Sequence, residues 1–96
     1  MSDMLKAVPI KENEIVGFKD VAGEEFIGKI MTLTETEIVV RQPCHYSSGG
    51  DGNFRITPAF RVALHGMVVI NRGNIIITHR IPDNLTEAYT KFVENG

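Results

Sequence analysis

The chain has 96 residues, a length that allows one small domain with a single modest core. Hydrophobic residues make up 43% and charged residues 23% of the sequence, which excludes a disordered chain, a collagen-like chain and a coiled coil. The net charge of −2 lacks the positive excess of a strong nucleic-acid binder, so any nucleic-acid contact must come from a local patch.

Three features favour a protein of the cytoplasm, either of a cell or of an infected host. Residues 1–9 lack a basic cluster followed by an apolar stretch, so no signal peptide is predicted. No run approaches the ~18 apolar residues that cross a bilayer, so no membrane partner is expected. The one cysteine, Cys44, has no internal disulfide partner, as is usual in a reducing compartment.

The first half of the chain is rich in β-forming residues. Residues 1–13 form a polar lead-in to a β domain that spans residues 14–81. Gly28 interrupts one strand, at a cost in stability unless the sheet bends there or another backbone comes close. Pro43 ends the last strand of this half. The expected strands cover residues 15–21, 24–31 and 37–42.

The second half begins with a change in composition. Residues 44–53 contain three glycines and two serines and predict a long mobile loop. Further strand-like segments follow at residues 53–57, 60–70 and 75–78. Between the last two, residues 71–74 predict a tight turn in which Gly73 is free to adopt a positive φ.

Residues 83–95 predict an amphipathic helix. Asn84 is the expected N-cap, with Glu87 as its reciprocal partner. The apolar side chains recur at helical spacing and form one stripe, made by Leu85, Ala88, Tyr89, Phe92 and Val93.

Two strands carry more apolar residues than one small sheet can bury. Residues 67–70 and 75–77 are apolar at every position, a pattern typical of strands that are covered on both faces. We therefore expect self-association, in which an edge strand of one copy joins the sheet of the next, and a ring if the arrangement closes. The alternative is a monomer whose helix covers these strands.

The order of the strands and two short motifs resemble the Sm-like (LSm) family. Residues 68–77 resemble its second motif, in which apolar residues flank an Arg-Gly turn, here Arg72-Gly73. Residues 23–30 resemble the start of its first motif, and the junction at residues 81–83 with its helix is similar to small Sm-like proteins of bacteriophages. The resemblance implies a mainly β fold: a strongly bent five-stranded antiparallel sheet, or small open barrel, followed by a helix. It also implies homo-oligomeric rings that bind RNA near the pore.

The first motif departs from the family pattern. The family's aspartate, base-stacking residue and asparagine fall on Thr34, Thr36 and Ile38, or on Glu37 for the last if one residue is inserted. Threonine has no flat face on which a base stacks. The resemblance therefore supports the fold better than uridine binding.

Arg72 is the strongest candidate for a nucleic-acid contact, because its guanidinium can stack on a base or hold a phosphate. Asn71 and Asn74 flank the Arg72-Gly73 pair and carry amides that hydrogen-bond bases, although asparagine is common in turns. The alternative for Arg72 is that it caps turn carbonyls or pairs with a glutamate.

The remaining candidates carry less weight. The basic residues are spread over three segments and favour a solvated surface; they are Lys29, Arg41, Arg55 and Arg61, with Tyr46 and Phe54 interleaved. Cys44, His45, His65 and His79 lack the spacing of a zinc site, so neither a metal nor a cofactor is expected. No catalytic constellation is recognisable, and an enzyme that uses Cys44 with a histidine is a minor hypothesis.

The sequence thus predicts a non-enzymatic, Sm-like, ring-forming protein that binds RNA or single-stranded nucleic acid weakly. The alternative is an oligomeric scaffold that recognises proteins and has no nucleic-acid role.

Overall fold

The computed structural model describes residues 10–51, 53–60 and 66–95. It confirms the mainly β class and the helix that follows the strands. The elements are β1 (Ile15–Asp20), β2 (Glu25–Leu33), β3 (Glu37–Ser48), β4 (Phe54–Pro58), β5 (Met67–Asn71), the 3₁₀ turn η2 (Arg72–Asn74), β6 (Ile75–His79) and α1 (Asp83–Asn95).

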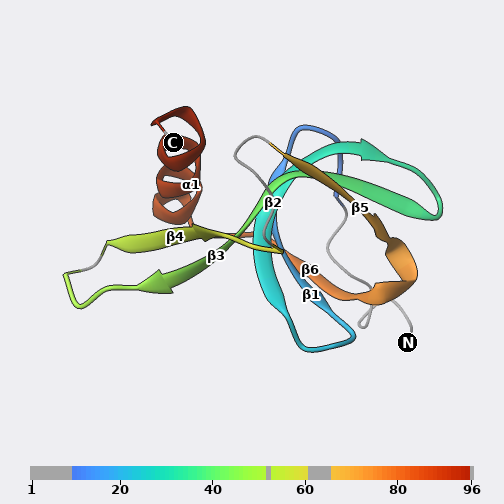
Figure 1. Ribbon diagram of the computed structural model, residues 1–96, viewed down its shortest axis with the longest axis horizontal. Helices are drawn as coiled ribbons and strands as arrows, with labels where there is room; N and C mark the ends of the chain where they lie inside the picture. Colours follow the sequence, from blue (N-terminus) through green and yellow to red (C-terminus); the bar gives the residue numbers. More distant parts are fainter. Residues whose placement is uncertain (1–9, 52, 61–65, 96) are drawn as a thin grey trace.

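The described strands form one antiparallel sheet in the order β4-β3-β2-β1-β6, and β5 also pairs with β3. The long strand β3 therefore has two partners along one edge: its first half pairs with β5 and its second half with β4. η2 joins β5 directly to β6, which lies at the opposite end of the sheet, so the sheet curls strongly (Figure 1). β5 and β6 do not pair with each other, and the barrel stays open.

Close approach of β2 and β3 explains the glycine within β2. A Cβ atom on Gly28 would overlap Cγ1 of Val40 and lie 3.4 Å from the carbonyl oxygen of Arg41. The pairing of β2 with β3 shifts register at this point, between Ile27 and Lys29, and again between Ile30 and Thr32, which bends the sheet. The expectation that Gly28 marks a bend or a close approach is confirmed.

The curled sheet separates two clusters of buried side chains. The inner cluster fills the curl and includes Phe18, Phe26 and Ile30, and the outer cluster lies beneath α1 and includes Ile27 and Tyr89. Because side chains alternate along a strand, β2 supplies both clusters. The hydroxyl of Tyr89 donates a hydrogen bond to the carbonyl of Arg41 at 2.7 Å and fastens α1 to β3.

The structure corrects the predicted end of the third strand. β3 continues through Pro43 to Ser48, so only residues 49–53 remain of the loop predicted over residues 44–53. Pro43 lies where β3 changes partner from β5 to β4, and its carbonyl still accepts a hydrogen bond from Ala59 N–H at 2.8 Å. A proline at such an irregular position removes little from the ladder.

The turn between the last two strands also differs from the prediction. Residues 72–74 form a 3₁₀ turn between strands that are not paired, and Gly23 is the one described glycine with a positive φ, so Gly73 does not adopt one. β5 begins at Met67, and residues 61–65 of the strand predicted over residues 60–70 lie outside the described residues.

Both ends of the β domain show smaller differences. Asn84 is not the N-cap of α1: the helix begins at Asp83, and the carbonyl of Pro82 accepts the N–H of Thr86 at 3.0 Å. Of the lead-in, residues 1–9 lie outside the described residues. Ile10 packs against the inner cluster, and Asn13 donates its N–H to the carbonyl of Ile30 at 2.7 Å, which ties this segment to β2.

Candidate functional site

The two segments that the sequence singles out lie side by side, although they are far apart along the chain. Thr34 and Thr36 belong to the turn between β2 and β3, and Arg72 begins η2. The N–H of Arg72 donates to the carbonyl of Thr36 at 2.8 Å, and its Nη1 donates to the carbonyl of Thr34 at 2.6 Å. We call residues 34–37 and 71–74 together the corner.

The turn side of the corner is held by its own hydrogen bonds. The hydroxyl of Thr34 accepts the N–H groups of Thr36 at 3.3 Å and Glu37 at 2.9 Å. The N–H of Thr34 donates to the carbonyl of Glu37 at 2.9 Å. These bonds form a tight side-chain-to-backbone turn, so the hydroxyl of Thr34 serves the backbone.

The other side of the corner is fixed by two asparagines. The side-chain oxygen of Asn71 accepts the N–H of Gly73 at 2.8 Å, and a Cβ on Gly73 would lie 3.2 Å from that oxygen. The carbonyl of Asn74 accepts the N–H of Val21 at 2.8 Å and joins the corner to the end of β1. A side chain at position 73 would therefore crowd the amide of Asn71, whereas the φ of Gly73 is not positive and sets no demand for glycine.

The charges at the corner do not favour a polyanion. Residues 34–37 and 71–74 contain one cation, Arg72, and two exposed acids, Glu35 and Glu37. One guanidinium donor of Arg72 bonds to the carbonyl of Thr34, so Arg72 caps a turn carbonyl as the alternative reading of the sequence expects. The guanidinium is exposed and has further donors. One cation offset by two acids gives this corner little long-range attraction for phosphate.

The described basic residues among Lys29, Arg41, Arg55 and Arg61 are not gathered into one patch. Lys29 and Arg41 are register partners on β2 and β3 and line a cavity of about 210 Å³ beside α1, together with Glu94. Arg55 lies on β4, and Arg61 lies outside the described residues. Tyr46 and Phe54 are half-buried and meet edge to face at 6.1 Å between ring centroids, within the outer cluster beneath α1.

Cys44 and the two described histidines, His45 and His79, each contact a different part of the fold. The thiol of Cys44 is buried and donates to the carbonyl of Gln42 at 3.3 Å. Nε2 of His45 lies 2.5 Å from Oε1 of Glu24, and the ring of His79 packs against Gly17. Among the described residues, which exclude His65, no three His, Cys, Asp or Glu side chains are arranged to hold a metal ion.

Burial raises the pKa of the Cys44 thiol from 9.0 to about 11. A pKa that is higher in the folded than in the unfolded state favours folding at neutral pH, and that contribution is lost as the pH rises through 9 towards 11. We expect Cys44→Ala to lack this loss, which amounts to about 2 kcal/mol. Urea unfolding of both proteins across this pH range measures the loss, and parallel pH profiles of the two proteins would contradict it.

We also expect iodoacetamide to leave the folded thiol of Cys44 unmodified at pH near 8.

Apolar side chains remain exposed on both strands that flank the corner. On β5, Met67 is 57% and Val69 is 62% exposed; on β6, Ile76 is 55% and Ile77 is 44% exposed. Val68, Ile70 and Ile75 turn inward to the core. Within the described residues α1 lies over β4 and the outer cluster, and these exposed side chains stay uncovered.

The chain matches no family model and no curated protein sequence. In the part of the chain that the structure describes, the helix is too short and too polar to cross a lipid bilayer.

Proposed function

We propose that this chain is a non-enzymatic, Sm-like protein that self-associates by adding β5 of one copy to β6 of the next. The supporting observation is that β5 and β6 each pair with one strand only, among the described strands, and each exposes apolar side chains. An uncovered apolar edge is a ready template for another strand.

The hydrogen bonds of β5 support this pairing. The N–H of Arg72 donates to Thr36, and the N–H of Gln42 donates to the carbonyl of Gly66 at 2.7 Å, one at each end of β5. Because the bonding of an antiparallel pair alternates, Met67, Val69 and Asn71 direct their N–H and C=O groups away from β3.

Joining two different edges produces a head-to-tail contact. Such a contact repeats at a constant angle, and it generates a closed ring where the rotation closes. In a ring every β5 and β6 edge is paired, so the apolar side chains of these strands are covered. The number of subunits depends on the rotation between neighbours.

Self-association is tested by light scattering on the purified chain. We expect a mass several times that of one copy, and Val69→Lys to weaken association at least about tenfold, because it places a charge in an apolar contact. Thr57→Lys is the matched control, since Thr57 is exposed on β4, away from both edges. A wild-type chain that stays monomeric at every concentration would contradict the proposal.

The corner is the proposed contact for single-stranded RNA, and Arg72 is its main residue. The ring repeats the guanidinium once per subunit, so many weak contacts act together. The acids at positions 35 and 37 keep the interaction weak, as does the use of one Arg72 donor on Thr34.

Polarisation titrations with labelled oligo-U and oligo-A test the RNA contact at low salt, where electrostatic affinity is greatest. We expect Arg72→Ala to weaken binding about tenfold and Arg55→Ala, the matched arginine control on β4, to leave it within about twofold. If the wild-type protein is oligomeric but binds neither probe at low salt, the RNA contact is contradicted and the proposed self-association still stands.

A second candidate function is an oligomeric scaffold that binds protein and no nucleic acid. The acids at the corner and the bond between Arg72 and Thr34 favour it. Pull-down with and without nuclease separates the two functions: partners lost on nuclease treatment support the RNA contact, and partners that persist support the scaffold.

A further inference from the structure

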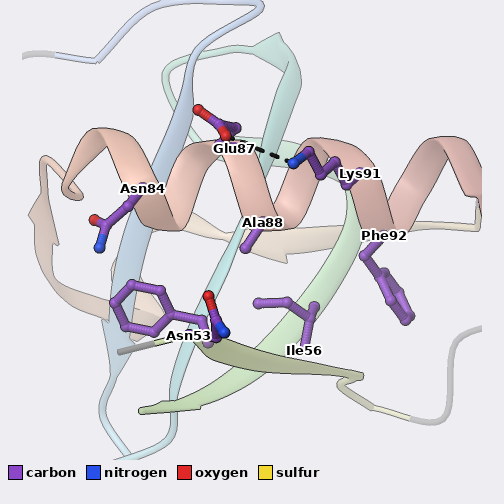
Figure 2. A pocket seen from close by; sticks show the side chains of 8 residues that line it. Asn53, Ile56, Asn84, Glu87, Ala88, Lys91 and Phe92 are labelled. Carbon is purple, nitrogen blue, oxygen red and sulfur yellow. Dashed lines mark ion pairs between the residues drawn. The ribbon is translucent and has the colours of Figure 1, made fainter. Parts of the chain in front are cut away.

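A groove of about 520 Å³ runs between β4 and α1, away from the corner. Four of its eight lining residues are apolar: Phe54 and Ile56 come from β4, and Ala88 and Phe92 come from α1. Figure 2 shows Ala88 and Phe92 extending from the helix towards β4, with Ile56 extending back from the strand. No residue of β3 lines the groove, so it opens on the outer side of β4.

The backbone of β4 presents hydrogen-bonding groups at this same edge. Ala59 N–H donates to Pro43, and Gly49 N–H donates to the carbonyl of Asn53 at 2.7 Å, one bond at each end of the β3–β4 ladder. Because the bonds of an antiparallel ladder alternate, Phe54 and Ile56 direct their N–H and C=O groups away from β3. Within the described residues β4 pairs with β3 alone. The residues that line the groove are therefore those whose backbone faces outward.

The charges of the groove are balanced. Glu87 and Lys91 lie at its rim and form an ion pair, which Figure 2 shows as a dashed line. The distance from Nζ of Lys91 to Oε1 of Glu87 is 3.6 Å. The other polar side chains of the lining, Asn53 and Asn84, are neutral amides. A groove without a net cation offers little to a phosphate backbone, which favours a neutral, apolar ligand.

We propose that this groove binds an extended peptide segment of a partner protein by strand addition to β4. The outward N–H and C=O groups of Phe54 and Ile56 are spaced along the edge of β4 to pair with an extended main chain. Apolar side chains at alternate positions of that peptide fill the space beside Ala88 and Phe92, since side chains of a strand alternate between faces. The site is independent of the proposed self-association, because β4 and β5 occupy different stretches of β3.

The test uses the isotope-labelled full chain and a short soluble peptide that alternates valine with threonine. Without peptide, the amide protons of Phe54 and Ile56 are expected to exchange faster with solvent than those of Arg55 and Thr57. With peptide, the first two amides become protected and their resonances shift. A second peptide has the same sequence but carries N-methyl groups on those residues whose N–H groups point to β4. It is expected to bind at least about tenfold more weakly.

Variants of the chain complete the test. Ala88→Glu narrows the groove and adds a charge, and it is expected to weaken peptide binding at least about tenfold. Thr57→Glu adds the same charge to β4, where Arg55 and Thr57 alternate with the groove-lining residues, and it is expected to leave binding unchanged. If Ala88→Glu fails to fold, the comparison of methylated with unmethylated peptide on the wild-type chain still decides.

Three results would overturn the proposal: no peptide binding at any accessible concentration, equal binding of both peptides, or shifts confined to residues outside the groove. The proposal would also be overturned if the Phe54 and Ile56 amides were protected without peptide and this protection increased with protein concentration. A second copy of the chain would then be the occupant. A monomeric protein that binds the peptide as described would contradict the proposed self-association alone.

Discussion

Phe26→Ala is expected to lower the free energy of unfolding by about 3–5 kcal/mol. Phe26 is 1% exposed in the inner cluster, where its ring stacks on Phe18 at 5.0 Å and meets Phe60 edge to face at 5.0 Å between centroids. Truncation removes both ring contacts and leaves a cavity in the inner cluster, whose side chains come from several strands and cannot collapse freely.

Equilibrium urea unfolding measures this loss. Val21→Ala is the control, because Val21 is also apolar but 63% exposed, and its truncation is expected to change stability by less than about 0.5 kcal/mol. A loss below about 1 kcal/mol for Phe26→Ala would show that the inner cluster is not the main core of the fold.

Gly28→Ala has the second-largest expected effect, a loss of about 1–3 kcal/mol. Gly28 does not have a positive φ, so the backbone accepts alanine and the cost comes from the overlap of the new Cβ with Cγ1 of Val40. The carbonyl of Arg41 lies 3.4 Å from the same Cβ and limits how far β3 can yield.

A double-mutant cycle with Val40→Ala separates this overlap from a general effect of replacing glycine. Val40 is fully buried, so its truncation alone destabilises the protein. In its presence Gly28→Ala is expected to cost less than about 0.5 kcal/mol, since the atom that it meets is gone. Additive losses would contradict the steric explanation.

The general architecture follows from local patterns in the sequence. The β-forming residues between positions 15 and 31 predict β1 and β2, and the spacing of apolar residues predicts α1 over residues 83–95, the range that the structure shows. The helix signal is clear because the helix buries one stripe at the helical period, whereas the strand signal comes from the β-branched and aromatic residues that suit a sheet.

Local patterns fail where a distant segment changes the energy of a residue. Pro43 reads as a strand end, but β3 passes through it because β4 and β5 both pair with β3 around that point. Asn84 reads as an N-cap, but the carbonyl of Pro82 already begins the hydrogen-bond ladder of α1. Residues 71–74 read as a hairpin turn, but the strands on either side have different partners.

The candidate sites divide in the same way. Arg72 is found from its motif, whereas its bond to Thr34, 38 residues away, is visible only in the folded chain. The groove beside β4 has a weak signal in the sequence, because apolar Phe54 and Ile56 alternate with polar residues. That signal lies next to the segment predicted to be a mobile loop. A groove between a strand and a helix depends on how two elements pack, and sequence spacing within either one does not encode that.

The sequence by itself determined the β-rich class, the helix and the excess of apolar residues on β5 and β6, because composition and periodicity report what must be buried. Only the tertiary structure decided which strand edges stay unpaired, that the turn and η2 meet at the corner, and that an apolar groove lies along the outer edge of β4. These features depend on contacts between residues distant in the chain, which arise when the sheet curls and α1 packs against it.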